Sequence, residues 1–264
     1  MLGPLTLCSG NRDQYLASPR SGTVLAMLAM SAGRAVPASQ LIEEVWPDKL
    51  LTNVRNALQA NVKRLRAVLG GLEGRPGEEI VCTAHSGYLL DLPVANVDAL
   101  GFLALADRGA RLVDSDPGEA ARILDAALGL WRGPAFFDTG TGPRLRAEAT
   151  TLEERRLRAH EDLITAQLRH GAAAGPAVLD RLSRLVSHHP ERERLVELQM
   201  LALYDDGRRA EALGVFHHVR RKMVDELGLE PGRALAGVYQ AILTQDERLG
   251  ERGAVYAARP HLTS

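Results

Sequence analysis

Five side chains between positions 55 and 66 have the chemistry of a DNA-reading surface. Arginine hydrogen-bonds guanine edges, asparagine and glutamine hydrogen-bond adenine, and lysine or arginine binds phosphate. At about 100° per residue, the set shares one side of a helix: Arg55, Gln59, Lys63 and Arg66, with Asn56 beside them. No acid lies between Thr52 and Leu69. Taken alone, the pattern fits a major-groove helix and a solvated basic face equally well.

An apolar stripe accompanies this polar face and predicts a helix that is buried on its other side. The stripe follows helical spacing and consists of Val54, Leu58, Val62, Leu65 and Leu69. Thr52 or Asn53 can cap the start of the helix, and Gly70-Gly71 can end it. Arg64 points away from the polar face, toward a flanking phosphate or an acid. Asn61 lies toward the apolar side, which predicts a helix-to-helix hydrogen bond.

The surrounding elements are those of a winged helix. Residues 22–30 form an apolar helical pattern, and residues 36–46 form a second, with Pro37 at its start. A loop containing Pro47 leads into the basic helix, and residues 70–77 are expected to form a glycine-rich loop after it. Residues 79–83 and 87–92 then alternate like two strands joined by a turn at 85–87. Three helices followed by such a hairpin predict a helix-turn-helix whose last helix reads DNA. Residues 1–7 and 14–17 are predicted to be short leading strands.

Composition favours helices and indicates that any nucleic-acid signal must be local. The chain has 264 residues, 45% hydrophobic but only 4% aromatic, and a formal net charge of −1. Cores of leucine, alanine and valine favour helices, and the net charge argues neither for nor against DNA. Cys8 and Cys82 fit no metal spacing and are expected to be reduced, half-buried thiols. No signal peptide or membrane span is recognised, so a cytoplasmic, nucleoid-associated protein is expected.

Beyond residues 92–96, the expected domain join, the sequence is almost entirely helical in pattern. The candidate helices are 99–112, 117–131, 144–168, 177–188, 191–205, 208–227 and 235–244. A weak repeat relates Gly171 to Gly207, each closing one helix before an alanine-rich one. Residues 204–213 resemble the turn of a tetratricopeptide unit, and residues 116–121 resemble another. The second domain is therefore expected to stack antiparallel helix pairs. The tail 247–264 has no stable period and is expected to be mobile.

Several ordered motifs resemble one family of regulators in both halves of the chain. In the first half they are Leu2-Gly3-Pro4-Leu5, Leu41-Ile42 with Trp46, Arg55-Asn56-Ala57-Leu58-Gln59, Arg64-Leu65-Arg66 and Gly87-Tyr88-Leu89-Leu90. In the second half they are the stretches 126–135, 189–195, 201–213 and 226–232. Together these motifs resemble the Streptomyces antibiotic regulatory proteins, over roughly residues 2–246.

The resemblance implies a mainly α fold and a regulatory function. An OmpR-like winged helix-turn-helix (1–93) would precede an all-α, tetratricopeptide-like bacterial transcriptional activation domain (97–246). The implied function is a transcriptional activator that binds direct repeats at antibiotic biosynthesis promoters as side-by-side copies. It would recruit RNA polymerase through its sigma factor and alpha subunit. The chain would be the family's short form, with no receiver or ATPase domain, no cofactor and no membrane partner.

Departures from the family pattern concern mainly the wing. The family commonly has arginine or proline around Ala84 and His85, so a minor-groove arginine is missing and His85 is a weak substitute. An aromatic residue is usual at Asn61. Arg20 keeps a basic residue typical of the first helix start, where it either reaches phosphate or is only solvated, and Ser21 is a candidate cap.

The remaining patterns in the sequence also have simpler explanations. Asp48 and Lys49, in the loop before the basic helix, are candidate polymerase contacts or merely solvate the turn. The histidine pairs 188–189 and 217–218 point apart on a helix and lack further ligands, so no metal site is expected. No nucleophile motif or phosphate loop is present, and the protein is not expected to be an enzyme. The alternative function is a protein-interaction scaffold with a structural or weakly binding winged helix.

Overall fold

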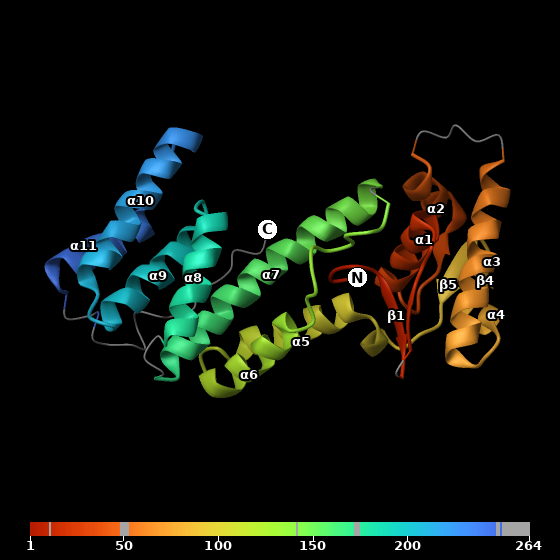
Figure 1. The fold of residues 1–264 in the computed structure, drawn as a ribbon, viewed down its shortest axis with the longest axis horizontal. Helices are drawn as coiled ribbons and strands as arrows, with labels where there is room; N and C mark the ends of the chain where they lie inside the picture. The colour runs from red at the N-terminus through yellow and green to blue at the C-terminus, as the bar shows by residue number, and fades with distance from the viewer. Residues whose placement is uncertain (11, 48–52, 141, 172–174, 247–248, 250–264) are drawn as a thin grey trace. The chain divides into compact units, whose positions relative to one another are not determined.

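The computed structural model describes residues 1–10, 12–47, 53–140, 142–171, 175–246 and 249 (Figure 1). The chain forms two compact units. The first contains residues 1–106 and 126–157, and the second contains residues 107–125 and 158 onward. The units therefore divide the chain differently from the expected ranges 1–93 and 97–246, which remain a prediction. Apart from Leu249, the tail expected to be mobile lies outside the described residues.

Three helices make the body of the winged helix in the first unit: α1 (Pro19–Met30), α2 (Ala38–Val45) and α3 (Val54–Glu73). Each packs against the other two. Ser18 caps α1, with its side chain accepting from the Ser21 N–H, and Pro19 occupies the first turn. The expectation that Ser21 caps this helix was wrong, because the chain turns into the helix three residues earlier and buries Ser21.

The basic helix α3 is longer than its sequence predicts. Asn53 caps its start by accepting from the Asn56 N–H at 3.3 Å, as one of the two expected caps. The helix continues through Gly70-Gly71 and ends at Gly74, whose φ of 68° forms a left-handed cap. A four-residue helix, α4 (Gly77–Ile80), follows and packs against α3. The expected glycine-rich loop at 70–77 and the strand start at Glu79 were therefore both wrong.

Two small antiparallel sheets complete the winged helix. Strands β1 (Thr6–Ser9) and β2 (Arg12–Tyr15) form a hairpin. They overlap the expected strands 1–7 and 14–17 only at residues 6–7 and 14–15. The second sheet has the order β3-β5-β4. Its members are β3 (Val36–Pro37), β4 (Val81–Ala84) and β5 (Gly87–Leu90). The hairpin β4–β5 is the predicted wing, while β3 occupies residues expected to belong to the second helix.

Gly87 is fixed by the close approach of two strands in this sheet. A Cβ atom on Gly87 would collide with the Val36 carbonyl oxygen and the Pro37 Cα across the β3–β5 pairing. We expect Gly87→Ala to destabilise the protein by about 1–3 kcal/mol, since the backbone must move. Gly71→Ala is the matched control: its Cβ would meet no atom within 4 Å, and alanine favours the helix. Denaturant unfolding of both variants checks this, and an unaltered Gly87→Ala midpoint would contradict the tight pairing.

Residues 126–157 belong to the first unit and form hydrogen bonds with the winged helix. The buried Glu44 carboxylate at the end of α2 accepts from Arg144 N at 2.9 Å and Leu145 N at 3.0 Å. These amides open helix α7 (Pro143–Arg169), so a carboxylate from α2 caps its N-terminus. Gly140 N donates to Thr23 Oγ1, and Leu5 N donates to Asp138. The winged helix therefore folds against a segment about a hundred residues away in sequence.

Helices α5 (Asp98–Leu112) and α6 (Pro117–Leu128) each belong partly to both units. The start of α5 and the end of α6 lie in the first unit, and the rest of each helix lies in the second. A short 3-10 helix, η1 (Val94–Asn96), precedes α5. Helix α6 ends three residues before the predicted Trp131. The Trp131 ring meets Phe102 edge-on at 5.3 Å, and Arg156 lies over it at 4.4 Å. Trp131 is thus half-buried and packed against these two side chains.

The second unit is built from helix pairs, as expected. Its helices include α8 (Pro176–His188), α9 (Glu193–Asp205), α10 (Arg209–Leu227) and α11 (Arg233–Thr244). All start within two residues of their predicted positions. Helix α9 packs against α8, α10 and α11, and its residues 195–203 are all buried. Gly171 and Gly207 both have positive φ, of 87° and 76°, at the turns that the weak repeat identifies.

Candidate nucleic-acid interface

The polar face of α3 is exposed along its first three turns. Leu58, Val62 and Leu65 are buried on the opposite side. Arg55, Asn56, Gln59, Lys63 and Arg64 are exposed. Within the described part of the chain, the side chains of Arg55, Gln59 and Lys63 have no hydrogen bond or ion pair. They are therefore available to a partner that offers acceptors.

Arg66, the last member of the predicted face, is bonded inside the protein. Its Nε donates to the Val81 carbonyl at 2.9 Å, and its Nη2 donates to Thr83 Oγ1 at 2.8 Å. Both acceptors belong to β4, so the guanidinium ties the wing to the end of α3. Helical spacing alone could not reveal the bond from Arg66 to β4, because β4 lies fifteen or more residues further along the chain. Direct DNA contact by Arg66 stays a prediction.

A buried polar pair sets the position of α3 against α1. Ser21 Oγ donates to Asn61 Oδ1 at 2.9 Å, and Asn61 Nδ2 donates to the Ala57 carbonyl at 2.8 Å. Both side chains are 5% exposed or less. The predicted helix-to-helix hydrogen bond of Asn61 is thereby confirmed, with Ser21 as its partner. Such a fully satisfied pair favours one register of the two helices.

The outlying candidate residues lie at the edges of this surface. Arg20 is exposed at the start of α1, and its guanidinium lies 5.9 Å from the Trp46 ring centre. Its position remains compatible with both phosphate contact and solvation. His85 is exposed in the turn between β4 and β5, at the tip of the wing. Asp48 and Lys49, the candidate polymerase contacts, lie outside the described residues.

The histidines and cysteines show other environments. Among the described residues, no cluster of three or more histidine, cysteine or acidic side chains could hold a metal ion. His188 Nδ1 lies 2.7 Å from the Arg184 carbonyl, and His217 Nε2 lies 3.4 Å from the Tyr239 hydroxyl. Cys8 and Cys82 are unpaired thiols, and Cys8 is exposed rather than half-buried as expected. No described helix is both long and apolar enough to cross a membrane.

Family models match both halves of the chain. The model described as "Transcriptional regulatory protein, C terminal" matches residues 12–90, which include α1 to β5. The model described as "Bacterial transcriptional activator domain" matches residues 97–243. An OmpR-like winged helix followed by a helical activation domain is thus the fold class, as the sequence predicts.

Individual relatives agree with these models. The chain is 40% identical to the transcriptional regulator RedD of Streptomyces coelicolor over 93% of its length and 70% of that protein. It is 33% identical to the regulatory protein DnrI of Streptomyces peucetius, over 96% and 94% of the two chains. A solved structure of Mycobacterium tuberculosis EmbR in complex with a low-affinity phosphopeptide superposes with a TM-score of 0.88. At 30% identity, it covers 97% of this chain and 67% of that one. The chain belongs to the Streptomyces antibiotic regulatory protein family of transcriptional activators.

Proposed function

We propose that the protein activates transcription of antibiotic biosynthesis genes by binding direct repeats in their promoters through α3. The observation that carries this proposal is the exposed face of α3 from Arg55 to Lys63, a stretch that contains no acid. Its arginine, glutamine and lysine have no partner within the described protein. The amides of Asn56 and Gln59 can bind adenine, and the guanidinium of Arg55 can bind guanine. A basic surface that only meets solvent does not require this combination. The combination therefore favours base readout over simple solvation.

The side chains divide between base readout and backbone contact. Arg55, Asn56 and Gln59 lie in the first turns of α3, where the recognition helix of a helix-turn-helix contacts base edges. Lys63 lies further along the same face, and Arg64 lies beside it, so both suit flanking phosphates. Arg66 holds the wing against α3 through β4. That bond would place His85, at the wing tip, near the adjacent groove or backbone.

Partners follow from the proposed binding mode. Direct repeats require head-to-tail copies on one face of the duplex, so the half-sites would be about 10–11 base pairs apart. The winged helix would bind DNA, while the helical activation domain and the residues Asp48 and Lys49 would meet RNA polymerase. The sigma factor and alpha subunit are the proposed contacts.

The contribution of Lys63 can be separated from base readout by its salt dependence. A phosphate contact releases counterions, so Lys63→Ala should weaken all DNA sequences alike and lower the log–log salt slope by about one. Titrations of specific and scrambled duplexes at several salt concentrations measure this. Arg184→Ala removes an exposed charge from α8 and should leave the slope unchanged. An unchanged slope for Lys63→Ala would place Lys63 off the phosphate backbone.

The function itself is tested by binding and transcription on promoter DNA from the protein's own gene neighbourhood. The full chain should shift such fragments in a gel and stimulate purified RNA polymerase on them. The triple variant Arg55→Ala, Gln59→Ala, Lys63→Ala should lose both activities while keeping its circular dichroism spectrum and unfolding midpoint. If the wild-type chain binds no promoter fragment more tightly than scrambled DNA, a protein-interaction scaffold becomes the better account.

A further inference from the structure

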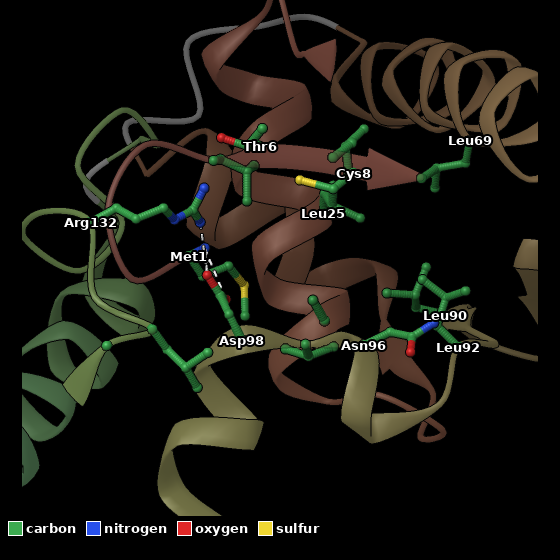
Figure 2. Close-up of a pocket in the computed structure, with 16 residues that line it drawn as sticks. Met1, Thr6, Cys8, Leu25, Leu69, Leu90, Leu92, Asn96, Asp98 and Arg132 are labelled. Atoms are coloured by element: carbon green, nitrogen blue, oxygen red, sulfur yellow. Dashed lines mark hydrogen bonds and ion pairs between the residues drawn. The ribbon is translucent and has the colours of Figure 1, made fainter. Parts of the chain in front are cut away.

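The first unit contains a cavity of about 380 Å³ beside strand β1 that the proposed DNA-binding function leaves unused (Figure 2). Its walls come from three parts of the unit: the winged helix, the join after β5, and the chain following α6. The apolar lining includes Leu5, Leu25, Leu69, Leu90, Leu92 and Leu130. A volume of this size and an apolar lining with few polar groups are typical of small-molecule sites.

The charged groups of this cavity, Asp98, Arg132 and the Met1 amine, lie together on one side (Figure 2). There the Asp98 carboxylate accepts from Arg132 Nη2 at 2.9 Å and from the Met1 amine at 2.7 Å. It also accepts from Leu2 N and from Ala99 N. Burial alone would raise the pKa of Asp98, but the charge and hydrogen bonds of these donors hold it below its ordinary value. Both carboxylate oxygens are therefore already occupied, and a cationic ligand would have to displace these donors.

Arg132 has donors to spare. Its guanidinium carries five N–H groups, and a single nitrogen, Nη2, bonds Asp98 among the described residues. The side chain is 44% exposed, and it lines the cavity. Its backbone is fixed by the bond from Arg132 N to the Leu2 carbonyl at 2.7 Å. A planar cation held in this way offers its free edge to a carboxylate or another anionic oxygen group.

We propose that this cavity binds a small amphipathic molecule with an apolar body and an anionic head. The body would fill the space between Leu25, Leu69 and Leu90, and the head would meet the free edge of Arg132. Leu69 belongs to α3, while Arg132 lies in the segment after α6. The occupant would thus contact the recognition helix and the activation-domain sequence together, and its binding would stabilise their association.

Two fluorescent probes with similar apolar bodies test the class of ligand. 8-Anilinonaphthalene-1-sulfonate carries an anionic head, and N-phenyl-1-naphthylamine lacks it. The full chain should bind the sulfonate saturably at one site and more tightly than the neutral amine. Arg132→Gln should weaken the sulfonate at least about fivefold and leave the amine within about twofold. If Arg132→Gln leaves the ratio of the two affinities unchanged, the assignment of an anionic head is wrong.

A cavity-blocking variant tests the site itself. Leu92 is half-buried in the lining, so Leu92→Trp should fill the space and weaken both probes at least about tenfold. Leu243→Trp is the matched control, because Leu243 is exposed on α11 in the second unit. Ala29→Phe, which fills the cavity from α1, provides a second blocking variant should Leu92→Trp fold poorly. Both probes binding the folded blocking variants as they bind the wild type would overturn the proposal.

Discussion

Replacing Arg55 with alanine is expected to cost about 1–3 kcal/mol of specific DNA binding, with little effect on binding to scrambled DNA. Arg55 is exposed in the first turn of α3 and makes no bond within the described protein. An arginine placed there can donate two hydrogen bonds to the O6 and N7 atoms of a guanine. Fluorescence anisotropy titrations of promoter and scrambled duplexes at one salt concentration measure the difference.

Two further variants make the Arg55 result interpretable. Arg55→Lys keeps the charge but loses the planar pair of donors, so it should recover nonspecific but not specific affinity. Arg221→Ala removes an exposed arginine from α10 and should change neither affinity. Equal losses of specific and nonspecific binding in Arg55→Ala would show that Arg55 contacts phosphate rather than a base.

Replacing Glu44 with alanine should destabilise the first unit by about 3 kcal/mol. Glu44 is 2% exposed, and its carboxylate is the acceptor for the amides of Arg144 and Leu145. Without it, two buried N–H groups at the start of α7 lose their partners, each at about 1–3 kcal/mol, less the relief of a buried charge. Thermal and denaturant unfolding followed by circular dichroism measure the loss.

The neighbouring Glu43 supplies the control for this variant. Glu43 is exposed on the same helix, so Glu43→Ala should leave stability within about 0.5 kcal/mol of the wild type. The same contact predicts that a fragment ending near residue 95 is less stable than one ending near residue 157, because only the longer fragment holds the start of α7. Equal stability of the Glu44→Ala and Glu43→Ala variants would show that the cap of α7 is dispensable.

Periodicity predicted the elements whose signal is local. The apolar stripe of α3 placed its buried and exposed faces correctly, and the helices after residue 97 were found within a few residues. The hydrogen bond between Asn61 and a neighbouring helix also followed from its position beside the apolar stripe of α3. These predictions succeeded because helical spacing depends only on neighbours along the chain.

The failures concern residues whose conformation depends on distant partners. Gly70-Gly71 looks like a helix end, but packing of α3 against α4 lets the helix continue to Glu73. The four residues of α4 are too few to show a period. The DNA contact predicted for Arg66 stays untested, but its bond to β4 could be seen only in the fold. Glu44 carries no local sign that it caps α7, since its partners lie about a hundred residues away.

Methylation protection of guanine N7 on a bound promoter shows whether α3 reads bases, because N7 lies in the major groove. We expect the wild-type chain to protect guanines in two segments about one helical turn apart. Arg55→Ala, at a concentration giving equal occupancy, should lose protection of the same single guanine in each segment. Protection that is identical in the two proteins, or absent from the major groove, would contradict the assignment of α3 as the recognition helix.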